Sequence, residues 1–262
     1  MLQNIQGGSD CRVLICGPHC SGKSSIMDTL QNNFNYNEKE YFESAGILGC
    51  IVNIQLQNLG QYSFKMTEIS GIYFQGEQMK FLSKVVNRFQ QNQFIIFTYS
   101  RQQRQHYLNI KKAISIISMM SQQLDGKFIY ILGTYSDVDE SLLQVTDLEG
   151  KKLAAKYNAQ YLSYSSKQKP IIKSLFYSIG SCQEFINRHP NNVSELKNYI
   201  NLISQMKRQK ESAVYQYKVL SNIYDQKIRR EIIYETLRLI SPISSSIQKI
   251  LENQQIYQFI FV

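Results

Sequence analysis

The sequence lacks paired cysteines and long apolar runs, and each absence excludes a class of protein. The five cysteines, at positions 11, 16, 20, 50 and 182, form no CxxC pair and show no finger-like spacing. Neither a zinc site nor a disulfide framework is therefore indicated, and we expect a reducing compartment. The apolar runs, such as Phe94 to Phe97, are far too short to span a bilayer.

Signals for membrane attachment are missing from both ends of the sequence. Residues 1–10 are polar and hold no apolar core, which argues against a secretory signal and a myristoylation site, and residues 259–262 offer no cysteine for prenylation. We therefore expect no direct membrane anchor, and any membrane recruitment would come through a partner. The formal charge of +9 is spread thinly along the chain, so no nucleic-acid partner is expected.

Short apolar runs alternate with amphipathic segments of helix length between residue 11 and about residue 186. This alternation is typical of an α/β fold with a sheet wound by helices. Six strands are predicted, at residues 12–16, 47–56, 62–68, 94–99, 127–132 and 160–163. Helices are predicted at residues 23–33, 78–89, 106–122, 148–157 and 171–187. Because residues 57–61 alone separate the second and third strands, we expect an antiparallel hairpin at one edge.

The break at Pro190 to Asn192 marks the predicted domain boundary. The 262 residues, 43% of them hydrophobic, suffice for one large domain or a medium domain with an appendage. We predict a short polar N-terminus at 1–10, a main domain at 11–189 and a C-terminal region at 190–262. The last region reads as helix, strand, helix and a final β-like run at 256–262, with apolar faces that need a partner surface.

The sharpest motif lies at residues 17–24, which read GPHCSGKS and fit the pattern G-x-x-x-x-G-K-[ST]. It follows a predicted strand and opens a predicted helix, which is the context that a phosphate-binding P-loop requires. Lys23 would reach the outer phosphates, and the Ser24 hydroxyl would ligate Mg²⁺. A chance glycine-rich turn is the alternative. The predicted phosphate-binding residues are Gly17, Pro18, His19, Cys20, Ser21, Gly22, Lys23, Ser24 and Ser25.

The elements expected to hold Mg²⁺ and to support hydrolysis are weakened. Glu68 stands at the end of the third predicted strand, where P-loop proteins usually carry an Asp that holds Mg²⁺ through water; a surface Glu is the alternative reading. Gly71 would offer its N–H to a terminal phosphate. Ser44 is the candidate switch hydroxyl on Mg²⁺, although a lone loop serine is often just solvated. Ile72 and Tyr73 supply no amide to orient a water, so we predict poor hydrolysis and infer no catalytic base.

Base recognition is predicted at the ends of the fifth and sixth strands. Residues 134–137 read TYSD against the pattern N-K-x-D, so Asp137 alone remains as the carboxylate that would pair with guanine. An ordinary loop aspartate is the alternative. After the sixth strand, Ser165, Ser166 and Lys167 are similar to the S-A-K loop whose backbone contacts the base.

In this order, the P-loop, Ser44, Glu68 with Gly71, Asp137 and the Ser165 to Lys167 loop resemble the Ras-like small GTPases over residues 11–188. The resemblance implies a Ras-like P-loop G domain, with a mixed six-stranded sheet and helices on both faces, that binds GTP or GDP with Mg²⁺. Within that superfamily the segments 12–26 and 37–44 are similar to the Rag (Gtr) GTPases of the C/D type. Rag proteins continue into a roadblock-like α+β dimerisation domain, and residues 190–215 resemble that junction. The chain would then hold only part of such a domain.

The Rag resemblance implies a heterodimer with a Rag A/B-type partner. It also implies a cytoplasmic protein, recruited by a scaffold complex to the lysosomal or vacuolar membrane, where nucleotide state is read by the target-of-rapamycin complex. Two alternatives stay open: a pseudo-GTPase that serves as a structural subunit of a larger assembly, and a Rab-like trafficking GTPase. The missing C-terminal cysteine counts against the second of these. Glu68, Ile72 and Tyr135 favour slow or absent turnover, whereas Lys23 and Ser24 favour retained nucleotide binding.

Overall fold

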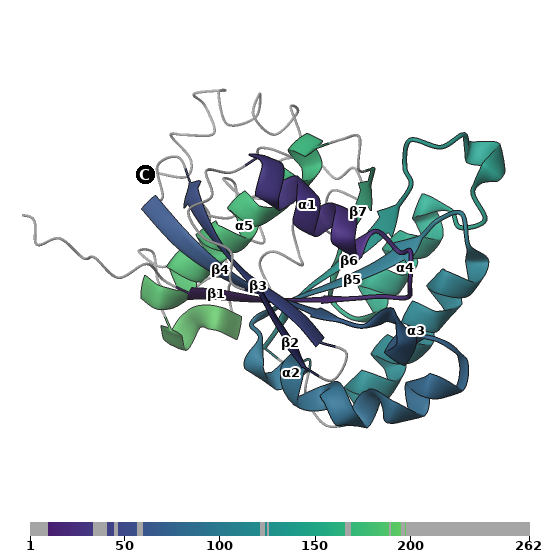
Figure 1. The fold of residues 1–262 in the computed structure, drawn as a ribbon, viewed down its shortest axis with the longest axis horizontal. Helices are drawn as coiled ribbons and strands as arrows, with labels where there is room; N and C mark the ends of the chain where they lie inside the picture. The colour runs from purple at the N-terminus through teal and green to yellow at the C-terminus, as the bar shows by residue number, and fades with distance from the viewer. Residues whose placement is uncertain are drawn as a thin grey trace, which may run out of the picture. The chain divides into compact units, whose positions relative to one another are not determined.

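A sheet of seven strands forms the centre of the part of the chain that the structure describes (Figure 1). The structure is a computed structural model, and it describes residues 10–33, 41–44, 47–56, 60–120, 124, 126–165, 169–188, 190–194 and 197. The strands are β1 (Asp10–Cys16), β2 (Tyr41–Ser44), β3 (Ile47–Leu56), β4 (Gly60–Ile69), β5 (Phe94–Ser100), β6 (Phe128–Thr134) and β7 (Gln160–Tyr164). Their order across the sheet is β2-β3-β4-β1-β5-β6-β7.

The five strands from β4 to β7 in this order run parallel, and the other two make an antiparallel edge. The predicted hairpin of β3 and β4 is confirmed, with Ile47 opposite Ile69 and Leu56 opposite Gly60. The predicted number of six strands is wrong, because β2 adds a seventh beyond β3. Four residues with a glutamate among them give little local β signal, and this strand is defined by its pairing with β3.

Four α-helices lie close to their predicted positions, and a fifth prediction is only partly right. The matching helices are α1 (Lys23–Asn33), α3 (Arg104–Met119), α4 (Asp147–Lys156) and α5 (Lys169–Arg188). Between β4 and β5 the chain forms the 3₁₀ helices η1 (Gly71–Phe74) and η2 (Gly76–Val85), followed by the short α2 (Val86–Gln91). Two further 3₁₀ turns are η3 (Glu140–Leu142) and η4 (Pro190–Asn192).

The unusual length of η2 follows from the spacing of its buried side chains. Runs of 3₁₀ helix longer than three or four residues are uncommon, yet η2 has ten residues. Its buried residues Met79, Leu82 and Val85 recur every third position, which matches three residues per turn. The sequence pattern predicts an ordinary helix at 78–89, and this threefold spacing accounts for the 3₁₀ geometry found instead.

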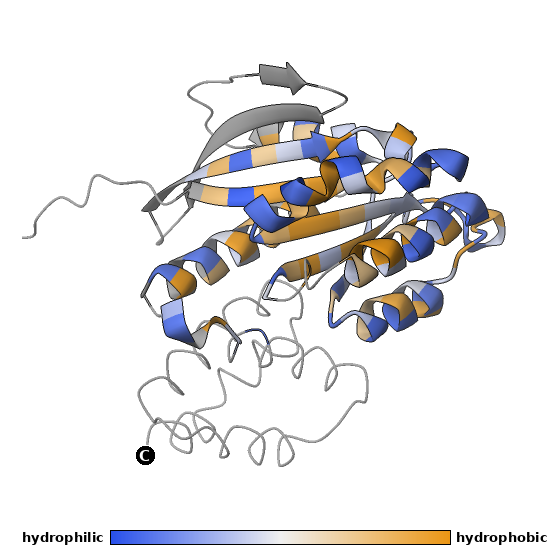
Figure 2. Cartoon of the chain, turned by 90° about the horizontal axis from the view of Figure 1, so that it is seen from below, coloured by the Kyte–Doolittle hydropathy of each residue, from blue (hydrophilic) through white to orange (hydrophobic). Residues whose placement is uncertain are grey.

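The core contains two layers because strand side chains alternate between the faces of the sheet. Leu14, Phe97 and Ile131 belong to one buried cluster with residues of η2, α2, α3 and α4. Val13 and Ile15, which alternate with Leu14 along β1, are fully buried on the other face. Figure 2 shows the central strands apolar along most of their length, between helices that carry both polar and apolar residues. This buried sheet is a rigid base for the loops at its carboxyl end.

The chain divides into two compact units, Met1–Lys173 and Ser174–Val262. The division falls within α5, and the predicted boundary near residue 190 stays a prediction. The predicted helices and strands beyond residue 197 lie outside the described residues, as do residues 1–9 of the predicted N-terminal segment 1–10, whose last residue begins β1. The roadblock-like reading of the C-terminal region likewise stays a prediction.

Candidate functional site

The predicted P-loop joins β1 to α1, as its motif requires. Gly17 lies so close to β5 that a Cβ there would overlap the carbonyl oxygen and the hydroxyl of Thr98. Gly22 has a φ of +92°, a conformation that favours glycine, and a Cβ would lie 2.9 Å from Cγ2 of Thr134. Both motif glycines are therefore demanded by the packing of the loop against its neighbouring strands.

Two threonines at the ends of β5 and β6 hold the P-loop in place. The Ser21 hydroxyl lies 2.7 Å from the Thr98 hydroxyl, which is also 3.3 Å from the carbonyl oxygen of Cys16. Thr134 Oγ1 lies 3.1 Å from the carbonyl oxygens of both Ser21 and Tyr99. Thr134 occupies the first position of the sequence TYSD, so it performs a tethering role in place of the expected asparagine.

Lys23 is folded back onto the loop that precedes it. Its Nζ donates hydrogen bonds to the carbonyl oxygens of Gly17 and Pro18, at 2.9 and 2.8 Å, and its side chain is 5% exposed. The carboxylate of Glu68 forms an ion pair with the same ammonium, with Oε1 3.7 Å from Nζ. Two carbonyl oxygens and one carboxylate therefore surround the three N–H donors of Lys23. Burial lowers the pKa of Lys23, and the charge of Glu68 opposes that shift.

Glu68 lies near the end of β4, next to β1 in the sheet and opposite Ile15. Its side chain is 14% exposed. Burial raises the pKa of the Glu68 carboxyl, while Lys23 acts in the opposite direction. The residue predicted to face Mg²⁺ thus lies beside the P-loop lysine, and the alternative reading of an ordinary surface glutamate does not fit this burial.

Gly71 brings the start of η1 against the P-loop. A Cβ at this position would overlap the backbone nitrogen of His19 and lie 2.7 Å from the carbonyl carbon of Pro18. The backbones of the two segments are therefore in direct contact. Gly71 therefore belongs to a segment that touches the P-loop, and the contact of its N–H with a phosphate stays a prediction.

Ser24 and Ser44, the two serines predicted to ligate Mg²⁺, lie at different distances from the P-loop. Ser24 is exposed in the first turn of α1, where backbone N–H groups have no partner within the helix. Ser44 ends β2 and pairs with Ile47 of β3 at the same end of the sheet. Three strand spacings of about 4.8 Å separate β2 from β1, so its backbone lies roughly 14 Å from the P-loop strand. Its role as an Mg²⁺ ligand stays a prediction.

The two loops predicted to contact a base lie side by side. Ser136 N–H donates to the carbonyl oxygen of Tyr164 at 3.1 Å, which joins the end of β6 to the end of β7. Asp137 follows in an exposed turn, and Ser165 is buried directly after β7. Ser166 and Lys167 lie outside the described residues. Tyr135, at the expected lysine position, has a φ of +64° and is 38% exposed.

Sequence reasoning missed three contributors to the site. Thr98 and Arg101 were not singled out, and the ion pair of Lys23 with Glu68 was not foreseen. A signal existed for Thr98, because it is a hydroxyl inside the apolar run 94–99, where an unpaired polar group would be costly. Arg101 comes directly after that run, but nothing in the sequence indicates that its side chain is buried.

A comparison with known families supports the geometry. A family model described as the Ras family matches residues 12–183, more than half of the chain. The chain belongs to the Ras family. Ras-family domains are small GTPases that bind GTP or GDP with Mg²⁺, so residues 12–183 form a nucleotide-binding regulatory domain with a P-loop. No curated protein matches the chain.

The described residues of this Ras-family domain fit a polyphosphate chain. Gly17 and Gly71 let the P-loop backbone pack closely against β5 and the start of η1, and the buried ammonium of Lys23 and the start of α1 supply positive charge. No cluster of three or more His, Cys, Asp or Glu suited to a metal occurs in the described parts. In a domain of this family, Ser24 and Glu68 would hold Mg²⁺ together with phosphate oxygens, and the ion would neutralise phosphate charge. None of the described helices is long and apolar enough to cross a membrane.

Proposed function

We propose that this Ras-family protein is a guanine-nucleotide-binding regulatory protein of Rag type, with slow or absent GTP hydrolysis. One observation carries the nucleotide-binding part of the proposal. Lys23 is buried against the carbonyl oxygens of Gly17 and Pro18 at the start of α1, although burial lowers its pKa. A buried, destabilised ammonium beside a helix N-terminus is the arrangement of a functional phosphate site.

Slow hydrolysis is supported by the end of β4 and the segment that follows it. Glu68 is paired with Lys23, and Ile72, one residue after Gly71, is an exposed apolar side chain at 47%. Tyr73 is half-buried and packs against the hydrophobic core. Neither Ile72 nor Tyr73 has an amide with which to orient an attacking water, so turnover would rest on positioning and charge alone.

The decisive experiment is the nucleotide content of the purified protein. Bound nucleotide is released by denaturation and separated by chromatography, and binding of labelled GTP and ATP is then measured with and without Mg²⁺. The matched variants are Lys23→Ala, which removes the P-loop ammonium, and Lys80→Ala, which removes an exposed lysine that contacts Glu77 and the ring of Phe81.

We expect stoichiometric guanine nucleotide in the wild type and in Lys80→Ala, and none in Lys23→Ala. Unchanged nucleotide content in Lys23→Ala would refute the site. An empty wild-type protein that ignores both nucleotides would refute nucleotide binding and support the structural alternative below.

The Rag type adds proposals about partners. The protein would form a heterodimer with a Rag A/B-type GTPase through residues 190–262, and a scaffold complex would recruit the pair to the lysosomal or vacuolar membrane. There its nucleotide state would be read by the target-of-rapamycin complex. The support is the resemblance of segments 12–26 and 37–44 to Rag proteins. Co-purification with a Rag A/B-type partner, lost when residues 190–262 are deleted, tests the dimer.

A pseudo-GTPase that serves as a structural subunit is the second candidate. The observation that favours it is the contact of Glu68 with Lys23, because an internal carboxylate occupies the charge that would otherwise meet phosphate. Partner binding with and without GTP separates the two functions. A regulatory protein binds its partner in one nucleotide state, whereas a structural subunit binds it equally in all states.

A further inference from the structure

Residues 135–144, which we name the base loop, are held at both ends by hydrogen bonds to Arg101, the residue that follows β5. The backbone N–H of Arg101 donates to the carbonyl oxygen of Thr134 at 3.2 Å, directly before the loop. The carbonyl oxygen of Arg101 accepts from the N–H groups of Gln144 and Val145, at 2.9 and 3.1 Å. The base loop carries Asp137, so Arg101 closes the segment that holds the predicted base-binding carboxylate.

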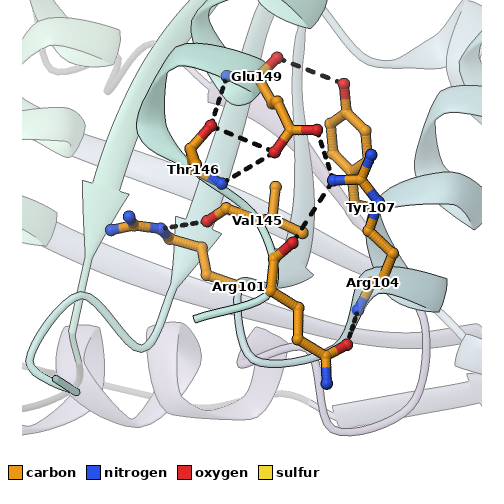
Figure 3. Close-up of polar contacts among 7 residues, drawn as sticks. Arg101, Arg104, Tyr107, Val145, Thr146 and Glu149 are labelled. Atoms are coloured by element: carbon orange, nitrogen blue, oxygen red, sulfur yellow. Dashed lines mark hydrogen bonds and ion pairs between the residues drawn. The ribbon is translucent and has the colours of Figure 1, made fainter. Parts of the chain in front are cut away.

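The side chain of Arg101 adds contacts beyond its backbone. Its Nε donates to the carbonyl oxygen of Val145 at 3.2 Å, which is drawn in Figure 3. Its Nη1 donates to Oγ of Ser163 at 3.0 Å and lies 3.2 Å from a carboxylate oxygen of Asp147. Ser163 lies in β7, two residues before Ser165. One guanidinium therefore connects the end of the base loop, the start of α4 and the strand that leads to the second predicted base contact.

Because the Arg101 side chain is buried, its contacts hold their partners in fixed positions. The Arg101 side chain is 8% exposed, and its stem lies over Gly133, where a Cβ would be 3.1 Å from the Arg101 Cδ. A buried guanidinium needs its hydrogen bonds satisfied, and its planar fork fixes the positions of its partners. Arg104, also in Figure 3, differs because it is 45% exposed where it meets Glu149. An exposed pair of that kind contributes little to position.

We propose that Arg101 is a positioning residue for the nucleotide base, which holds the base loop and the end of β7 in one arrangement so that Asp137 and Ser165 face the same ligand. Tyr135 occupies the position where the family pattern has a lysine. Arg101, which is hydrogen-bonded to both ends of the base loop, supplies a fixed cation to that loop instead. The proposal rests on the proposed nucleotide-binding function and goes beyond it, because it separates base binding from phosphate binding.

The test compares a ligand that has a base with one that has none. Binding of GTP and of inorganic tripolyphosphate, each with Mg²⁺, is measured for the full-length wild type, Arg101→Met and Arg101→Lys. Methionine keeps most of the stem over Gly133 and removes the guanidinium, and lysine keeps the charge without the fork. The control is Arg88→Met, since Arg88 makes an exposed contact with Gln91.

We expect Arg101→Met to weaken GTP binding about tenfold, the equivalent of one charged hydrogen bond, and to leave tripolyphosphate binding unchanged. The GTP affinity of Arg101→Lys is expected to lie between those of the wild type and Arg101→Met. The GTP affinity of Arg88→Met is expected to match that of the wild type. A general loss of structure would weaken both ligands together, so the ratio of the two affinities is the readout. Where Arg101→Met does not fold, Ser163→Ala, which removes one acceptor alone, gives the same comparison.

The outcomes separate this proposal from the function on which it rests. An unchanged ratio of GTP to tripolyphosphate affinity in folded Arg101→Met or Ser163→Ala overturns the positioning role, while nucleotide binding stands. Equal affinity of the wild type for GTP and ATP overturns it as well, because no base would then be distinguished. A wild type that binds neither GTP nor tripolyphosphate refutes the proposed function, and the positioning role with it.

Discussion

The ion pair of Lys23 with Glu68 gives the sharpest prediction about stability. Two unit charges 3.7 Å apart attract by about 4 kcal/mol at an effective dielectric constant of 20. Burial nevertheless lowers the pKa of Lys23 and raises the pKa of Glu68, so desolvation outweighs the attraction for both groups. Replacing both charges by neutral groups of similar size is therefore expected to stabilise the nucleotide-free protein by about 1–3 kcal/mol.

The variants are Lys23→Met, Glu68→Gln and the double change. Lys23→Met leaves a buried carboxylate without its cation and is expected to be less stable than the wild type by about 2 kcal/mol. In that variant, stability should fall further as pH rises through the raised pKa of Glu68, because the ionised form is the costly one. Glu68→Gln should cost less, since Lys23 keeps its two carbonyl acceptors.

The assay is urea unfolding at neutral pH of protein stripped of nucleotide and Mg²⁺, because bound ligand would add its own stabilisation. The double-mutant cycle is expected to give a coupling of at least about 3 kcal/mol, because each single variant loses stability and the double variant gains it. Single variants whose effects simply add, or a double variant less stable than either single one, would refute the reasoning that the pair is retained at a cost in stability.

Three further predictions concern neighbouring features. Thr134→Val removes the hydroxyl near the carbonyl oxygen of Ser21, and should cost about 1–3 kcal/mol in thermal unfolding and speed the release of a fluorescent GTP analogue. Gly71→Ala places a methyl group against the P-loop backbone and should weaken GTP binding in a titration. Gly76→Ala meets no atom within 4 Å but has a φ of +48°, so it should cost about 1 kcal/mol of stability and leave binding unchanged; equal effects on binding would contradict this. The pKa of Glu149 is lowered by hydrogen bonds in its capping box, so stability should fall as pH drops below about 4.5, and the slope should be smaller in Glu149→Gln when urea midpoints are compared across pH.

The parallel part of the fold could be predicted because its signals are local. Strand β5 is a mostly apolar run, and α4 follows the capping box of Thr146 with Glu149 and begins one residue before its predicted start. Strand β2 could not be predicted, since four residues acquire their conformation from hydrogen bonds to β3. The 3₁₀ geometry of η2 depends on which side chains face the core, and a sequence that alternates polar and apolar residues leaves that choice open.

The site shows the same division between local and long-range information. The P-loop could be predicted because eight consecutive residues determine both its shape and its chemistry. The sequence predicts Glu68 at the end of its strand, but its contact with Lys23, 45 residues earlier in the chain, depends on β4 lying next to β1. The contacts of Arg101 with Val145 and Ser163 join residues 44 and 62 positions apart, and no local pattern reports them.

Gly71 touches the P-loop, and the 3₁₀ helix η2 follows it in the chain. The geometry of η2 limits how far this segment can shorten. A 3₁₀ helix rises about 2.0 Å per residue and an α-helix about 1.5 Å, so conversion of its ten residues would shorten the segment by about 5 Å. The same conversion would rotate Met79 by about 120° relative to Val85 and carry one of them out of the core. The length of this segment is therefore coupled to the core, and contraction toward Gly71 requires a buried side chain to move.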